Sequence, residues 1–317
     1  MRGFPLNIRN EKQLKSVLGV TPIIFDDLVA SFDVYIQIEK AAQYYTWMYG
    51  GRERKPAEQS VAKLSTAPMQ VAFVLYYLKN YVLMETFAER FSMSKAHASN
   101  SLKFFLQRLQ EVLNEWEVLP HRSFDTPEQM QQYMEEQDWN KILIDVTERR
   151  HHRPKDETEQ RAIYSGKKKA HTVKNTVMTD ENRYIHVLGL TTQGSIHDYG
   201  LLQLEWDNIK PWFSTATVFV DTAYIAMVKD YIVNKVFAPF KRKRKPKGQP
   251  KDELTEEQKQ FNKELSKVRI TVEHAIGGMK IFHCLKHVWR GRRFNFDDQI
   301  ALLSAGLWNA HLRSHFS

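Results

Sequence analysis

Two aspartates in this chain each follow a short apolar run. Asp145 follows Ile142-Leu143-Ile144, and Asp221 follows Val218-Phe219-Val220. Such runs are typical of strands buried on both faces of an α/β sheet, and ligands bind beyond the carboxyl ends of these strands. Carboxylates that converge there repel one another unless cations neutralise them, and hard oxygen ligands favour Mg²⁺ or Mn²⁺. Asp221 could instead only cap the following helix, because Asp is a favoured N-cap residue.

The composition indicates an intracellular globular protein with a polyanionic partner. The chain has 317 residues and a net charge of +9, and Cys284 is its one cysteine. No apolar run is long enough for a membrane helix. Residues 1–138 carry a balance of −2, so residues 139–317 carry +11. A basic half favours nucleic acid as the partner, although a solvated basic surface is the alternative. We expect a cytoplasmic protein, nucleoid-associated if bacterial and nuclear if eukaryotic.

The first 118 residues read mainly as helices, with a polar loop at residues 50–56, and residues 83–109 have the pattern of a helix-turn-helix. Residues 83–91 fit the first helix and Ser92-Met93-Ser94 the turn, with Ser94 capping a second helix from Lys95 to Leu109. The outward face of that helix offers DNA the side chains of Lys95, His97, Ser99, Asn100, Lys103 and Arg108. A plain three-helix bundle with a polar surface is the alternative.

Residues 120–140 read as a connector, and we place a domain boundary near residue 138. The segment 139–317 then contains a strand with Asp145, an antiparallel pair, a helix, a strand with Asp221, a helix over residues 225–232, a short strand and a long helix from Glu256 to about Ile281. This is the element order of the ribonuclease-H-like fold, an α/β fold with a mixed sheet in which carboxylates converge. Two metal ions roughly 3.5–4 Å apart in such a site can activate an attacking oxygen and stabilise the leaving oxygen of a phosphodiester.

Five segments carry a resemblance to a known family. They are Ile144-Asp145-Val146-Thr147-Glu148, the segment 164–174, Ser195-Ile196-His197-Asp198, Val220-Asp221-Thr222-Ala223-Tyr224 and Arg269-Ile270-Thr271-Val272-Glu273-His274. In this order they resemble the DDE-type transposases of bacterial insertion sequences and their Harbinger-like eukaryotic relatives. The resemblance covers residues 141–312, and the helix-turn-helix matches the family's N-terminal domain more loosely. Thr222-Ala223 departs from the family, which often has glycine near the second acid.

The resemblance implies a DNA transposition reaction. Water hydrolyses a phosphodiester at the end of the element, and the freed 3′-hydroxyl attacks target DNA. By position, Asp145, Asp221 and Glu273 would be the catalytic, metal-binding triad and would hold two Mg²⁺ or Mn²⁺ ions. The implied partners are the terminal inverted repeats and the target DNA, with a homodimer on the DNA. A domesticated DNA-binding protein and a structure-specific endonuclease on the same fold are the alternatives.

Basic residues near the three acids would line the DNA path through salt-dependent phosphate contacts. We expect this role for Arg149, Arg150, Lys167, Lys168, Lys169, Lys174, Lys241, Arg242, Lys243, Arg244, Arg292 and Arg293. Ser195-Ile196-His197-Asp198 matches the S-x-x-D form of a capping box, which gives Asp198 first of all a structural role.

Overall fold

The structure, a computed structural model, describes residues 8–49, 64–242, 253–291 and 295–314. The predicted polar loop at residues 50–56 and the predicted DNA contacts Lys243, Arg244, Arg292 and Arg293 lie outside these ranges. The chain folds as two compact units. The first runs to Leu119 and includes Ile281–His287 and the chain from Asn309 onward, and the second comprises Pro120–Lys280 and Val288–Trp308. The connector predicted over residues 120–140 therefore belongs with the second unit.

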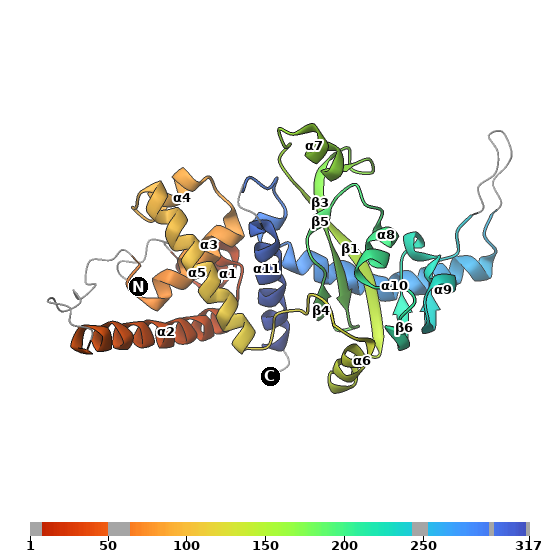
Figure 1. Ribbon diagram of the computed structural model, residues 1–317, viewed down its shortest axis with the longest axis horizontal. Helices are drawn as coiled ribbons and strands as arrows, with labels where there is room; N and C mark the ends of the chain where they lie inside the picture. The colour runs from red at the N-terminus through yellow and green to blue at the C-terminus, as the bar shows by residue number, and fades with distance from the viewer. Residues whose placement is uncertain (1–7, 50–63, 243–252, 292–294, 315–317) are drawn as a thin grey trace. The chain divides into compact units, whose positions relative to one another are not determined.

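The first unit is helical, as the sequence predicts (Figure 1). Its elements are α1 (Glu11–Leu18), α2 (Pro22–Tyr49), α3 (Ala67–Asn80), α4 (Met84–Arg90), α5 (Lys95–Glu115) and the short 3₁₀ helix η2 (His283–Leu285). Helix α3 is its central element, because five consecutive residues from Val71 to Leu75 are buried. The ring of Phe73 packs against Phe87 of α4 and Phe105 of α5, with centroids 4.5 and 6.1 Å away.

The two helices predicted at residues 83–109 are present and joined by a short turn. Ser94 is the N-cap of α5, and its side chain accepts a hydrogen bond from the backbone N–H of His97 at 3.2 Å. Leu102, Phe105, Leu106 and Leu109 are buried, as their spacing predicts. The prediction is wrong for one residue of the outward face. Arg108 is buried, and its guanidinium donates to Gln70 and Glu39.

The second unit is built on a mixed β-sheet. Its elements are α6 (Pro127–Glu136), β1 (Lys141–Arg150), α7 (Glu157–Ile163), β2 (Tyr164–Ser165), β3 (Ala170–Thr179), β4 (Ile185–Leu188), β5 (Thr192–Gln193), α8 (Asp198–Glu205), β6 (Phe213–Phe219), η1 (Thr222–Tyr224), α9 (Met227–Asp230), β7 (Val233–Phe237), α10 (Glu256–Met279) and α11 (Phe296–Arg313), the last of which ends in the first unit. The strand order is β2-β3-β1-β6-β7, and β4 and β5 also pair with β3. Strand β1 is antiparallel to β3 and parallel to β6, which is parallel to β7.

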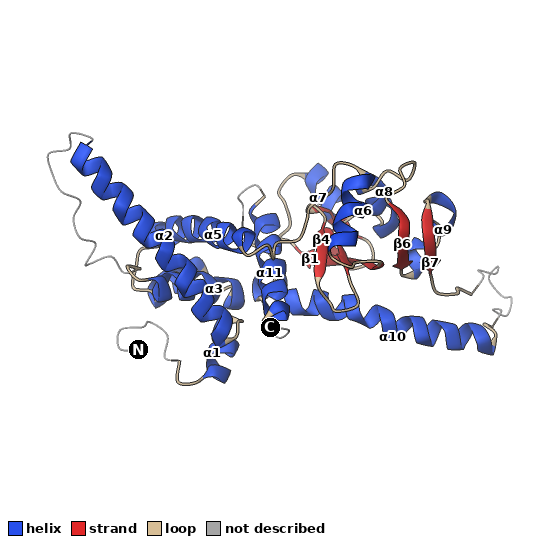
Figure 2. Ribbon diagram, turned by 90° about the horizontal axis from the view of Figure 1, so that it is seen from below, coloured by secondary structure: helices blue, strands red, loops and turns tan. Residues whose placement is uncertain are grey.

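Helices cover both faces of this sheet, with α6 and α8 on one side and α10 on the other (Figure 2). On the first side, Ile142, Ile144 and Val218 of the central strands pack with Leu202 and Trp206 in one apolar core. On the other side, α10 buries Leu265, Val272, Ala275 and Met279. Since both faces are covered, the central strands read as continuous apolar runs rather than alternating ones.

Most of the predicted elements are observed, with one clear shortening. Helix α10 begins at Glu256, as predicted, and β6 leads directly to Asp221. The helix expected over residues 225–232 is reduced to α9, a single turn that η1 precedes and β7 follows at Val233. No helix in the described part of the chain is both long and apolar enough to cross a membrane.

Candidate active site

Asp145 and Asp221 lie at the end of the parallel strand pair in the middle of the sheet. Strand β1 pairs with β6 only from Lys141 to Leu143, and Leu143 is opposite Phe219. Each aspartate follows the last residue of the β1–β6 pairing by two positions. Asp145 still pairs with Val177 of β3, because β1 continues to Arg150, whereas Asp221 follows the end of β6. The edge beyond the carboxyl ends of parallel strands is the usual ligand site of an α/β fold.

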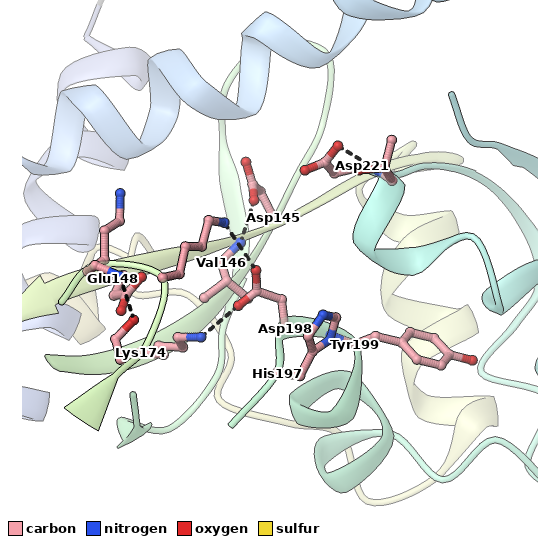
Figure 3. A network of polar contacts seen from close by, with 12 residues as sticks. Asp145, Val146, Glu148, Lys174, His197, Asp198, Tyr199 and Asp221 are labelled. Carbon is pink, nitrogen blue, oxygen red and sulfur yellow. Dashed lines mark hydrogen bonds and ion pairs between the residues drawn. The ribbon is translucent and has the colours of Figure 1, made fainter. Parts of the chain in front are cut away.

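Backbone amides hold both carboxylates in place (Figure 3). Asp145 Oδ1 accepts from the N–H of Val146 at 2.8 Å, and Asp221 Oδ1 accepts from the N–H of Thr222 at 2.5 Å. Asp221 is thus also the N-cap residue of η1. The capping role and the site role are compatible, since the second oxygen of the carboxylate is not used by the cap.

Arg269 of α10 lies between the two aspartates. One terminal guanidinium nitrogen is 3.8 Å from Asp145 Oδ2, and the other is 3.7 Å from Asp221 Oδ1. Burial raises the pKa of Asp145, and the charges of Asp221 and Asp198 act in the same direction. The Val146 amide and Arg269 oppose that rise. The two carboxylates therefore place negative charge where burial disfavours it, and the guanidinium of Arg269 lies beside both.

Glu273 is not brought together with the two aspartates. It lies on α10 one helical turn after Arg269, and its side chain is exposed. Across the ranges that the structure describes, no three His, Cys, Asp or Glu side chains come close enough to hold a metal ion. The role of Glu273 in a triad stays a prediction.

Asp198 joins the site from the other face of the sheet. Lys174 Nζ of β3 donates to Asp198 Oδ1 at 2.9 Å and to the carbonyl of Ile196 at 2.8 Å, as Figure 3 shows for the side chains. The ammonium of Lys167 is 3.8 Å from the other carboxylate oxygen. The predicted capping box placed Ser195 at the N-cap of α8, and that is wrong. His197 is the N-cap of this helix, and its side chain accepts a hydrogen bond from the N–H of Tyr199. Asp198 is the partner of two lysines instead.

Lys280 lies near enough to Asp145 for their charges to interact, and the sequence did not predict this. Its ammonium donates to the carbonyl of Glu148 at 3.3 Å, and burial lowers its pKa to about 8. The charges of Glu148 and Asp145 act on it in the opposite direction. The spacing in the sequence could have predicted this position. Lys280 follows Glu273 by seven residues, and Arg269 precedes Glu273 by four. Residues at these spacings share one face of a helix.

Two of the predicted DNA contacts are interior residues. Arg149 is buried, and its guanidinium donates to Asn175 Oδ1 at 2.8 Å, to Thr191 Oγ1 at 2.8 Å and to the carbonyl of Asp297 at 2.9 Å. Lys174 is only 5% exposed and is paired with Asp198. Neither side chain is presented to a phosphate. Both belong to the polar interior beside the sheet.

The other predicted contacts that the structure describes are surface residues. They are Lys95, Asn100 and Lys103 in the first unit and Arg150, Lys167, Lys168, Lys169, Lys241 and Arg242 in the second. Lys95 is paired with Glu85. Lys167, Lys168 and Lys169 form an exposed turn between β2 and β3, and Lys169 has a left-handed backbone with a φ of 53°. Their contact with DNA stays a prediction.

Comparison with known proteins places this chain in a family. The family model described as "DDE superfamily endonuclease" matches residues 144–309, which is more than half of the chain. A protein of Microchaete diplosiphon named "Probable transposase for insertion sequence element IS702" is 32% identical over 196 residues, which are 62% of this chain and 66% of that protein. The chain thus spans slightly less than two thirds of the relative. No solved structure matches at a significant level. The matched span contains Asp145, Asp221 and Glu273, and the chain belongs to the DDE superfamily endonucleases.

Proposed function

We propose that this protein is a DNA transposase, which cuts the ends of its element and joins them to target DNA. The observation that carries the proposal is the position of Asp145 and Asp221, each two residues beyond the end of the parallel pairing of β1 and β6, within a span that belongs to the DDE endonucleases. The name of the relative from Microchaete diplosiphon supports the same activity.

The two aspartates suit divalent metal ions. Their ligand atoms are carboxylate oxygens, which Mg²⁺ and Mn²⁺ prefer. The side chains of Asp145 and Asp221 are 25% and 43% exposed, so an ion can reach them from solvent. The guanidinium of Arg269 already lies beside both, which indicates where positive charge is favoured. Two bound ions would supply the Lewis acidity that activates the attacking oxygen and stabilises the leaving oxygen.

Glu273 is the third acid of the proposed site. It shares α10 with Arg269, and α10 packs on β1, β3 and β6. The central order β3-β1-β6, with β3 antiparallel and β6 parallel to β1, supports the proposal of a ribonuclease-H-like fold for residues 139–317.

DNA would be held by surfaces of both units. In the second unit, the proposed phosphate contacts are Arg150, Lys241, Arg242 and the turn of Lys167, Lys168 and Lys169. In the helical domain, residues 1–138, α4 and α5 would act as a helix-turn-helix that presents Asn100 and Lys103. Two element ends must be brought together during transposition, so a homodimer on DNA completes the proposal.

The chemistry of the chain's own residues is limited to positioning. Asp145 and Asp221, fixed by the amides of Val146 and Thr222, would hold the ions, while the basic residues hold the phosphates. In the first reaction, water attacks the phosphodiester, and the P–O bond to the 3′-oxygen breaks to leave a 3′-hydroxyl. In the second, that hydroxyl attacks a phosphodiester of the target, whose own 3′-oxygen leaves.

The test uses duplexes that carry the terminal repeats of the element. Asp145→Asn, Asp221→Asn and Glu273→Gln should each lower cleavage and strand transfer by about a hundredfold to a thousandfold, the loss expected when an essential electrostatic group is removed. DNA binding should remain measurable. The matched control is Glu264→Gln on the exposed face of α10. Full activity in the Asp145 or Asp221 variant would refute the proposed site, and full activity in the Glu273 variant would remove that residue from it.

A further inference from the structure

Arg269 lies between the two carboxylates of the proposed metal site. Its two terminal nitrogens face two different carboxylates, one on β1 and one after β6, at 3.8 and 3.7 Å. Its side chain is 13% exposed, and its Nε is buried without a hydrogen-bond partner among the described residues. The guanidinium therefore lies in the space between the two acids that the proposed function assigns to metal.

From this geometry we infer that Arg269 is the resident counter-ion of Asp145 and Asp221 in the metal-free protein, and that divalent cations must displace it to bind. The inference rests on the proposed function, because it concerns the same two carboxylates. It adds an intramolecular cation that competes with metal for the site.

The distances indicate that the pairing can be displaced. A bidentate arginine–carboxylate pair has hydrogen bonds of about 2.7–2.9 Å, whereas both separations here exceed 3.5 Å. Each carboxylate instead receives its short hydrogen bond from a backbone amide. Arg269 thus contributes charge rather than a fixed fork of hydrogen bonds. Its guanidinium stays protonated at any physiological pH, so the pair is not released by loss of the arginine's charge and a competing cation has to displace it.

The positive charge of Arg269 decides whether its removal strengthens or weakens metal binding. Without Arg269, the two carboxylates face each other with no cation between them, and Asp145 is already poorly solvated. The metal-free state becomes less favourable, while the metal-bound state loses only a repelling charge. Removal of the arginine should therefore strengthen metal binding in the absence of DNA. As a result, the wild-type protein binds metal weakly until the arginine is moved away.

The test is titration of the full-length, DNA-free protein with Mn²⁺, followed by calorimetry or by the Mn²⁺ electron paramagnetic resonance signal. Arg269→Ala and Arg269→Gln should tighten Mn²⁺ binding by about tenfold, which corresponds to about 1.4 kcal/mol. Arg269→Lys keeps the charge and should stay within about threefold of wild type. Lys267→Ala removes an exposed cation from the same helix and should change nothing. Arg269→Gln retains much of the side-chain length, in case the alanine variant folds poorly.

Thermal unfolding gives a second measurement. Mn²⁺ should raise the melting temperature of Arg269→Gln, relative to the same variant in chelator, by more than it raises that of wild type. Unchanged or weaker Mn²⁺ binding in both the alanine and glutamine variants would overturn the inference. If Asp145→Asn and Asp221→Asn lose Mn²⁺ binding in that same experiment, the metal site itself stands. If those two variants bind Mn²⁺ as wild type does, the metal site of the proposed function is wrong, and the inference about Arg269 falls with it.

Discussion

Lys174 donates a hydrogen bond to Asp198 at 2.9 Å, and this pair connects β3 to the first turn of α8 behind the candidate site. Lys174 is 5% exposed and also donates to the carbonyl of Ile196. Loss of one member of a buried pair leaves the other charge uncompensated, which costs several kcal/mol. The pair therefore fixes the start of α8 and with it the carboxylate whose charge acts on Asp145.

We predict that Lys174→Met lowers the free energy of unfolding by about 2–3 kcal/mol, because Asp198 keeps partial access to solvent and the full cost of burial does not apply. Urea denaturation checks this value. The double variant Lys174→Met/Asp198→Asn should recover at least half of the loss, since no charge is left unpaired. Lys167→Ala removes only the exposed and more distant lysine and should stay within about 0.5 kcal/mol of wild type. Equal losses for the Lys174 and Lys167 variants would contradict the assignment.

The turn between β2 and β3 gives a prediction about DNA. Lys167 and Lys168 are exposed on it, and each phosphate contact contributes about 0.9 to the slope of log K against log salt concentration. Lys167→Ala/Lys168→Ala should therefore weaken duplex binding at 50 mM salt and make the slope shallower by about 2. Fluorescence anisotropy over a salt series measures both quantities.

The control for the salt series is Lys141→Ala. Lys141 is equally a surface lysine, but it lies at the first residue of β1 and is paired with Glu181 at 2.8 Å. Its removal should leave the slope unchanged. An unchanged slope in the Lys167/Lys168 variant would show that this turn does not contact phosphates.

The sequence predicted the elements of the site better than the partners of its side chains. Apolar runs that end in an acid identified β1 and β6, because strands buried on both faces need continuous apolar residues. Arg149 was wrongly expected at the surface, since it lies in a basic run. Its burial depends on Asn175, which the antiparallel register of β1 and β3 brings close by pairing it with Thr147. That register is not encoded in any local pattern. The pairing of Lys174 with Asp198 was missed because it joins β3 to α8 through two residues 24 apart, and no local pattern encodes the packing of these elements.

Glu205 of α8 gives a prediction about pH. Both its carboxylate oxygens are inaccessible to solvent, and burial raises the pKa of Glu205 to about 7, against weaker lowering by Thr176 and Arg122. A carboxyl whose pKa is higher in the folded than in the unfolded protein costs nothing below about pH 4.5. Its cost grows as the pH rises from about 4.5 to about 7, and it stays constant above that pH, where the carboxyl is ionised in both states. Its contribution to stability therefore falls with rising pH.

Glu205→Gln should remove this dependence. At pH 8 the variant should be more stable than wild type by about 1–3 kcal/mol, and at pH 5 the difference should be much smaller. Denaturant unfolding at both pH values measures it. Glu135→Gln, on the exposed side of α6, is the control and should show no pH-dependent difference. A constant offset between wild type and Glu205→Gln at both pH values would mean that the carboxyl is not neutral in the folded protein.

Two adjacent glycines near the end of α10 allow a matched test of how this helix is held. A Cβ atom on Gly278 would lie 2.3 Å from the ring of Trp308 on α11, whereas one on Gly277 would meet nothing within 4 Å. The indole N–H of Trp308 donates to the carbonyl of Arg183 at 2.9 Å, so the ring cannot move away freely.

Gly278→Ala should lower the free energy of unfolding by about 1–3 kcal/mol through overpacking. Gly277→Ala should raise it by about 0.5–1 kcal/mol, because alanine loses less backbone entropy in a helix. Since α10 carries Arg269 and Glu273, Gly278→Ala should also reduce DNA cleavage while Gly277→Ala preserves it. Equal stability of the two variants in urea would show that the close approach of α10 to Trp308 does not position the helix.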